Sequence, residues 1–374
     1  MTAKNRDRTC ITNFACSIRR YFGLELPHAS LEEADRLLDE LQPENVVTIL
    51  CDGLGSVLLK KMLPEDAFLR TRQISTLSSV FPPTTVAAET ALATGRYPVE
   101  TGMLGWTMYY KDLDDNFTVF LNTRASDPES GPLQEAAAWR QEHLKEKSIV
   151  DEINEQKKGQ GYFLIPFQPD PYRDFDQMLE RIEFLCAQKG RKYIFAYDLQ
   201  PDEILHEKGC DAKEAKETVL ERNDKIEALC SRLKNTLVFV TADHGHINVK
   251  NIDLSQYPDL TDCLVRNPSL EPRAACFFVR EEKKREFESL FEKYFSDDFD
   301  LYSREEVIES GLFGDGAENE IFREALGDFL AVAGTDKALI AKGGSHCRSH
   351  HGGLTEDEML VPLTALDCCT SRKK

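Results

Sequence analysis

Short apolar runs alternate with longer amphipathic stretches along most of the chain. The β-branched runs at 46–51, 192–197 and 236–240 are typical of buried strands. The segments 173–189 and 212–234 have the spacing of amphipathic helices. This alternation predicts an α/β fold with a mainly parallel central sheet flanked by helices.

Residues 247–340 have a different pattern, in which a helix-like segment lies between two strand-like segments. It predicts a small α+β insertion, a candidate lid, before the apolar stretch 359–366 returns to the main sheet. We therefore expect a core of residues 1–246 and 341–374, with 247–340 inserted into it.

Each of the three apolar runs ends in polar residues. Asp52 follows the first run, residues 198–202 follow the second, and residues 241–246 follow the third. Ligands of open α/β sheets gather at the carboxyl ends of the strands, so this layout predicts an active site there.

The composition narrows the class of partner. The 374 residues include 46 Lys and Arg against 65 Asp and Glu, a net charge of −19, which argues against binding a nucleic-acid polymer. An anionic small molecule stays open, because bound metal ions reverse the local charge. The sequence leaves the oligomeric state open.

The sequence also bears on location. It contains no apolar run of about 18 residues, so we expect no membrane span. The N-terminal stretch has no apolar region typical of a signal peptide. Eleven cysteines, an odd number without a Cys-x-x-Cys motif, are typical of reduced thiols. We therefore expect a cytoplasmic enzyme.

One helix start has a composition suited to binding an anion. Pro82 and Pro83 precede the helical stretch TVAAETALATG, which stops at Gly95. Thr84 or Thr85 would lie at the helix N-terminus, where free N–H groups favour an anion or an alkoxide. Threonine is also a common helix cap, which is the structural alternative.

Metal ligands are available in three places. Asp202 and His206 are four apart and would share one helical face, as ligands or as a surface ion pair. Asp243 and His244 follow a strand directly. A third group is histidine-rich and lies beside glycines: His346, His350 and His351. Cys347 does not predict a structural zinc site, because no second cysteine lies at ligand spacing.

Three aspartates, three histidines and a threonine hydroxyl suit two metal ions around a nucleophile. Paired metals activate an attacking oxygen and stabilise in-line displacement at phosphorus. Two dications against three carboxylates would leave the site positive within an acidic protein.

Five motifs occur in a characteristic order: CDGLG, FPPTTVAAETALATGRYPVETGMLGW, PDEILH, TADHGH and HHGGLTEDEMLVPL. With them the chain resembles the alkaline phosphatase superfamily, and most closely its type I phosphodiesterase/nucleotide pyrophosphatase family. The resemblance implies an alkaline-phosphatase-like core that cleaves small-molecule phosphate diesters or pyrophosphates.

The resemblance also implies roles for single residues. Thr85 would be the nucleophile and form a phospho-threonine intermediate. Two divalent metals are implied, zinc with manganese as the alternative. Their ligands would be Asp52, Thr85, Asp243 and His244 for one ion, and Asp202, His206 and His351 for the other.

The chain departs from the family pattern at Trp106, where nucleotide pyrophosphatases carry an asparagine that binds the phosphoryl oxygen. Trp106 would donate one N–H, stack on the substrate, or be a packed aromatic. Alternative activities are those of a phosphomonoesterase, a phosphonate hydrolase or a phosphomutase, and the non-enzymatic alternative is an inactive metal-binding homologue.

Overall fold

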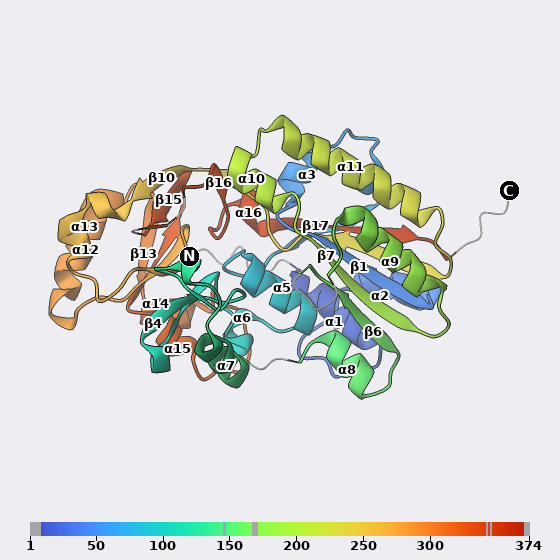
Figure 1. The fold of residues 1–374 in the computed structure, drawn as a ribbon, viewed down its shortest axis with the longest axis horizontal. Helices are drawn as coiled ribbons and strands as arrows, with labels where there is room; N and C mark the ends of the chain where they lie inside the picture. The colour runs from blue at the N-terminus through green and yellow to red at the C-terminus, as the bar shows by residue number, and fades with distance from the viewer. Residues whose placement is uncertain (1–8, 145–146, 167–170, 342, 345, 370–374) are drawn as a thin grey trace.

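The computed structural model describes residues 9–144, 147–166, 171–341, 343–344 and 346–369. The first eight residues of the N-terminal stretch considered above lie outside this description. A six-stranded sheet forms the part of the molecule on the right in Figure 1. Its strands, in spatial order, are β2 (Gln73–Ser78), β17 (Leu360–Asp367), β8 (Thr236–Thr241), β1 (Asn45–Cys51), β7 (Lys192–Asp198) and β6 (Gln160–Leu164).

The α/β class is confirmed, whereas a mainly parallel arrangement is not, because the second sheet described below is antiparallel. Strands β6, β7, β1 and β8 pair in parallel, but β17 is antiparallel to both of its neighbours, β8 and β2. The chain enters β17 directly from residues 349–359, at the carboxyl edge of β1 and β8. A strand that starts at this edge without a crossover helix has to run antiparallel to them.

Helices cover both faces of this sheet (Figure 1). One face carries α1 (Ile11–Tyr21), α5 (Thr85–Thr94) and α8 (Ile149–Glu155), with α2 (Glu32–Leu41) packed on α1. The other face carries α3 (Ser56–Met62), α9 (Phe175–Ala187) and α11 (Lys213–Cys230), with α4 (Phe68–Thr71) and α10 (Asp202–Lys208) packed on α11. The runs that predicted strands and the stretches that predicted helices α9 and α11 therefore form those elements.

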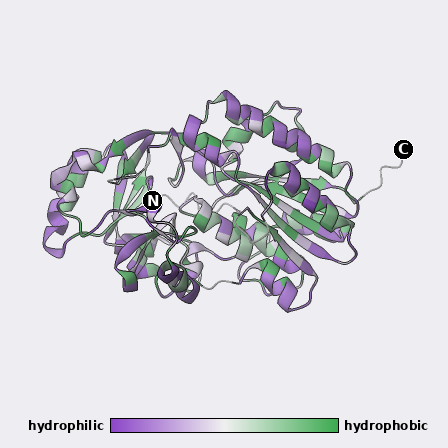
Figure 2. Ribbon diagram, in the orientation of Figure 1, coloured by the Kyte–Doolittle hydropathy of each residue, from purple (hydrophilic) through white to green (hydrophobic). Residues whose placement is uncertain are grey.

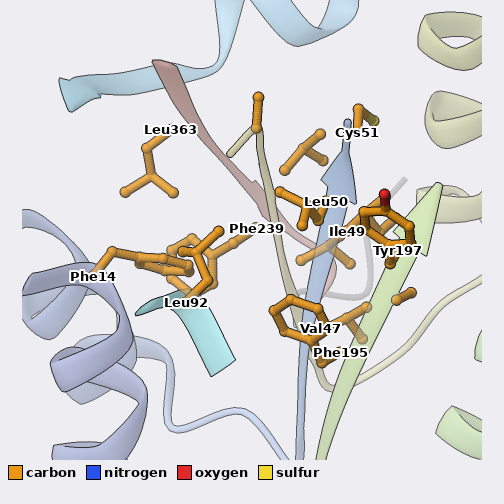
Figure 3. Packing of buried hydrophobic residues seen from close by; sticks show 14 of the residues in the cluster. Phe14, Val47, Ile49, Leu50, Cys51, Leu92, Phe195, Tyr197, Phe239 and Leu363 are labelled. Atoms are coloured by element: carbon orange, nitrogen blue, oxygen red, sulfur yellow. The ribbon is translucent and has the colours of Figure 1, made fainter. Parts of the chain in front are cut away.

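The main core lies between the sheet and its helices. Figure 2 shows apolar strands inside and mixed, largely polar helices outside. The rings of Phe14 on α1 and Phe239 on β8 meet edge to face at 5.0 Å, and Leu92 on α5 lies beside them (Figure 3). Burial of Leu92 fixes α5, and with it the position of Thr85 at the helix start.

A second sheet, on the left in Figure 1, is antiparallel throughout. Its strands, in spatial order, are β13 (Phe299–Ser303), β14 (Phe329–Ala333), β12 (Ala274–Phe277), β11 (Ser269–Glu271), β3 (Thr107–Tyr110), β4 (Asp115–Thr118) and β5 (Thr123–Arg124). Residues 107–124 thus pair with strands from the region 247–340. The division into a core and an insertion stays a prediction.

The remaining elements are short or peripheral. The other helices are α6 (Pro98–Thr101), α7 (Gln134–His143), α12 (Pro258–Thr261), α13 (Lys284–Phe295), α14 (Arg304–Ser310), α15 (Phe322–Ala325) and α16 (Glu356–Met359). Two small pairings join β9 (Ile247–Asn248) to β16 (Ser349–His350), and β10 (Lys250–Asp253) to β15 (Lys337–Ile340). Within the described ranges, no helix combines the length and apolarity needed to cross a bilayer.

Candidate active site

The predicted site residues gather at the carboxyl ends of three neighbouring strands. Asp52 follows β1, Asp243 follows β8, and Asp202 begins α10 just after β7. Thr85 is the first residue of α5, and its hydroxyl approaches the same place. The parallel register of the strands, with Cys51 opposite Asp198, brings these side chains together.

One group of donors surrounds the imidazole of His244. Its Nε2 atom lies 3.3 Å from Asp52 Oδ1, 3.5 Å from Asp243 Oδ2 and 3.3 Å from Thr85 Oγ1. All four residues are buried, and Thr85 is the most accessible at 7%. Two carboxylates, an imidazole and a hydroxyl therefore point at one small volume.

Hydrogen bonds leave one oxygen of each carboxylate aimed at this volume. Tyr197 donates its hydroxyl to Asp52 Oδ2, and the backbone N–H groups of Gly53 and His244 donate to Asp243 Oδ1. Asp52 Oδ1 and Asp243 Oδ2 are buried without a hydrogen-bond partner among the described residues. Burial and the neighbouring Asp243 hold the pKa of Asp52 well above its usual range. A dication between these oxygens would offset both charges, so the donor set fits a metal ion.

A second group of donors surrounds Asp202. Its Oδ1 atom lies 3.4 Å from His206 Nε2 and 4.0 Å from His351 Nε2. Burial opposes the charges of Asp202 and His206, but their mutual attraction outweighs it. This attraction holds the pKa of Asp202 below its usual range and raises the pKa of His206 to about 9. His351 donates from Nδ1 to the carbonyl of Pro83, which leaves its Nε2 facing the group.

His246 belongs to the same group, although sequence reasoning did not single it out. Its Nε2 lies 2.6 Å from Asp202 Oδ1, and Asp202, His206, His246 and His351 have the spacing of metal ligands. The sequence did carry a signal, because His246 follows His244 across a single glycine at the end of β8. Asp202 also has ligand spacing with Asp52 and His244, so the two groups adjoin.

Glycines allow the loops that carry these residues to touch. A Cβ atom on Gly245 would lie 2.0 Å from the carbonyl oxygen of Asp357, and one on Gly55 would lie 2.5 Å from Gly245 Cα. Gly53 has a φ of +73°, and a Cβ there would lie 2.9 Å from the His246 ring. Side chains at Gly53 and Gly55 would push the loops after β1 and β8 apart, and one at Gly245 would push the loop after β8 away from α16.

Glu271 is a second residue that sequence reasoning did not identify. This buried carboxylate comes from β11 of the second sheet and accepts hydrogen bonds from the Thr84 hydroxyl and the backbone N–H of Trp106. Burial raises the pKa of Glu271 to about 7. Thr84 is therefore committed to Glu271, while Thr85 faces the donor groups. The sequence signal for Glu271 was weak, because the pattern of residues 247–340 predicted an insertion and no site residue within it.

A cavity of about 1730 Å³ opens over these residues. Asp52, Thr85, Asp202 and His351 line it at the carboxyl end of the six-stranded sheet, and Glu271 lines it from the second sheet. The Trp106 side chain also lines the cavity and is 38% exposed, so it is not a packed core aromatic. The cavity can hold a substrate much larger than one phosphate group.

Comparisons with known proteins agree with this picture. A family model described as type I phosphodiesterase/nucleotide pyrophosphatase matches residues 46–354. No curated protein sequence matches.

Solved structures with the same fold include murine ectonucleotide pyrophosphatase/phosphodiesterase 5 (TM-score 0.66, 17% identity) and its human counterpart (TM-score 0.65, 18% identity). A third is an inactive variant of the murine protein in complex with AMP (TM-score 0.64, 18% identity). Each alignment covers 86% of this chain and 87% of the other.

Proposed function

The chain belongs to the type I phosphodiesterase/nucleotide pyrophosphatase family and is a phosphoric ester hydrolase, and from this premise we propose a two-metal reaction with Thr85 as its nucleophile. The substrate would be a small-molecule phosphate diester or pyrophosphate. The observation that carries the proposal is the pair of unpartnered, buried carboxylate oxygens on Asp52 and Asp243, which flank the Thr85 hydroxyl.

The proposed ligands fall into two sets. Asp52, Thr85, Asp243 and His244 would hold one ion, and Asp202, His206 and His351 would hold the other. When bound, the cations would lower the pKa of the Thr85 hydroxyl and neutralise charge that develops on the phosphoryl and leaving oxygens. Imidazole and carboxylate donors suit zinc, with manganese as the alternative.

The chain's own residues position the chemistry. Thr85 Oγ would form a bond to phosphorus as the bond from phosphorus to the leaving oxygen breaks, which gives a phospho-threonine. Water would then attack the same phosphorus and release Thr85. Free N–H groups in the first turn of α5 would hold the phosphoryl oxygens. Trp106 would stack on a planar group of the substrate at the cavity wall.

The region 247–340 would act as a wall, because Glu271 joins it to the start of α5 through Thr84. We also propose that the protein is located in a reducing, cytoplasmic environment. All eleven cysteines are free thiols, which supports it.

The test compares hydrolysis of bis-p-nitrophenyl phosphate with that of p-nitrophenyl phosphate, with zinc or manganese added. Thr85→Ala should abolish turnover and keep metal binding at the other ligands, while the matched control Thr84→Ala should retain turnover. Preferred diester cleavage supports the proposal, whereas preferred monoester cleavage moves the assignment to a phosphatase. Unchanged turnover by Thr85→Ala would reject the role of Thr85 as the nucleophile.

A further inference from the structure

His246 is as deeply buried as the proposed metal ligands and lies among them. It is 1% exposed, and its ring centroid lies 4.7 Å from that of His206 and 5.1 Å from that of His351. Its Nε2 is 2.6 Å from Asp202 Oδ1, closer than the Nε2 atoms of the other two histidines. The ligand set implied by the family resemblance gives His246 no role.

The proposed histidine ligands share one mode of orientation. In each, Nδ1 lies within hydrogen-bond distance of a backbone carbonyl: Ser349 for His206 at 2.8 Å, Pro83 for His351 at 3.1 Å, and Gly245 for His244 at 3.2 Å. Because a carbonyl only accepts, Nδ1 carries the proton. A histidine that binds a metal is neutral, so its lone pair is then on Nε2, as in histidines that bind metals in proteins.

His246 is oriented in the same way through a side chain. Its Nδ1 lies 3.1 Å from Ser349 Oγ, and that hydroxyl donates its single hydrogen to the carbonyl of Leu205 at 2.6 Å. The hydroxyl therefore accepts from His246, and Nδ1 of His246 carries the proton. The antiparallel pairing of β16 with β9, which places Ser349 opposite Asn248, fixes this contact.

The Nε2 atom of His246 points at Asp202 Oδ1, and at 2.6 Å the two atoms hold either a proton or a metal ion between them. With a metal bound, the neutral ring would offer its Nε2 lone pair to the ion beside Asp202, within the ligand spacing that these four residues share. The distances from Asp202 Oδ1 to the three Nε2 atoms, 2.6, 3.4 and 4.0 Å, bracket the spacing of about 3.3 Å between donors in a tetrahedron with zinc bonds of about 2.0 Å.

We propose that His246 is a fourth protein ligand of the metal held by Asp202, His206 and His351, an assignment that rests on the two-metal function proposed above. This ion would have one carboxylate and three imidazoles around it, and it would expand to five-coordinate to take the leaving oxygen. The other ion would have two carboxylates, one imidazole and the Thr85 oxygen. Because imidazole donors favour zinc and carboxylate oxygens favour harder cations, the imidazole-rich position should be the more selective for zinc.

His350 supplies a matched control. It is buried beside the same group, with its ring centroid 5.2 Å from that of His206. Among the residues that the structure describes, it has ligand spacing with His206 and Cys347 alone. Its Nε2 has no hydrogen-bond partner among the described residues. His206 has one lone pair on Nε2, so it serves a single ion, and we assign that ion to the Asp202 group.

The test titrates zinc against a competing chelator in wild type, His246→Gln and His350→Gln. We expect two zinc ions per chain in wild type, an affinity at least 10-fold weaker for one of them in His246→Gln, and wild-type binding in His350→Gln. Ser349→Ala, which removes only the hydroxyl that orients His246, should give a smaller loss at the same ion. Ser349→Ala also replaces His246→Gln as the test variant if His246→Gln does not fold.

A crystal structure of the zinc-loaded wild type, with zinc located by anomalous scattering, gives a readout independent of any variant. It should place Nε2 of His246 about 2.0–2.1 Å from one ion. A distance beyond 3 Å, or wild-type zinc affinity in His246→Gln, overturns the role of His246 and leaves the two-metal function standing. Absence of zinc binding by the wild type overturns both proposals.

Discussion

Replacing Asp52 by asparagine should stabilise the metal-free protein and weaken its metal binding at the same time. Without a cation, Asp52 Oδ1 and Asp243 Oδ2 face each other across His244 as buried acceptors without a donor. An asparagine at position 52 keeps the bond from Tyr197 and replaces the second oxygen by an N–H donor. The same change removes one charged ligand from the metal site.

The distances set the size of the effect. Both carboxylate oxygens lie within 3.5 Å of His244 Nε2, so they are no more than about 7 Å apart. At an effective dielectric constant of 20, two charges at that separation repel by at least about 2 kcal/mol. We expect Asp52→Asn to raise the free energy of unfolding of the chelator-treated protein by about this amount at pH 7.

The raised pKa of Asp52 also predicts how the free energy of unfolding depends on pH. Because burial raises the folded-state pKa of Asp52, the folded protein binds more protons than the unfolded chain above about pH 4, and stability falls as the pH rises. The advantage of Asp52→Asn should therefore be small near pH 4 and grow towards neutral pH, until the folded-state pKa is passed.

The assay is urea unfolding with chelator and with saturating zinc, from pH 4 to pH 8. With zinc the order should reverse, and wild type should be the more stable. Asp198→Asn is the matched control at the end of the adjacent strand, where the carboxylate pairs with Arg222 at 2.9 Å. It should lower stability under both conditions. A chelator-treated Asp52→Asn that is less stable than wild type at pH 7 would refute the reasoning.

Three further outcomes follow from the geometry. Gly245→Ala should destabilise the fold by about 3 kcal/mol or more, since its Cβ would overlap the Asp357 carbonyl, and an unchanged urea midpoint would contradict this. Trp106→Ala should raise KM for an aryl diester about 10-fold with kcat retained, and equal losses on a methyl diester would argue against stacking. Glu271→Gln should gain stability relative to wild type as the pH rises from about 4.5 to about 7, because over that range the unfolded chain ionises Glu271 while its raised folded-state pKa keeps it protonated. If the urea midpoints of Glu271→Gln and wild type change with pH in parallel, the raised pKa of Glu271 is excluded as a source of instability.

The strands of the six-stranded sheet that carry the site were predictable because they are continuous apolar runs. A strand buried on both faces has few polar residues, as 46–51 and 236–240 illustrate. The direction of β17 was not predictable from its composition. Strands β3–β5 were missed because they are short and partly exposed, and pair with residues far along the chain.

The candidate residues were predictable where a local pattern places them. Asp52 and Asp243 follow strands, and Thr85 follows two prolines at a helix start. Glu271 and His246 depend on contacts between distant segments. Nothing within a few residues of Glu271 indicates that Thr84 and Trp106 bind it, and the orientation of His246 depends on Ser349, 103 residues later.

The pairing of Thr107 on β3 with Leu270 on β11 has a consequence for synthesis of the protein. The two residues are 163 positions apart, so at about 5–20 residues per second the first waits roughly 8–30 s for its partner to leave the ribosome. During that interval the hairpin of β3 and β4 has an open edge on the β3 side. The cavity wall is therefore completed late in translation, and the nascent chain most needs protection from aggregation while residues 107–124 await the second half of their sheet.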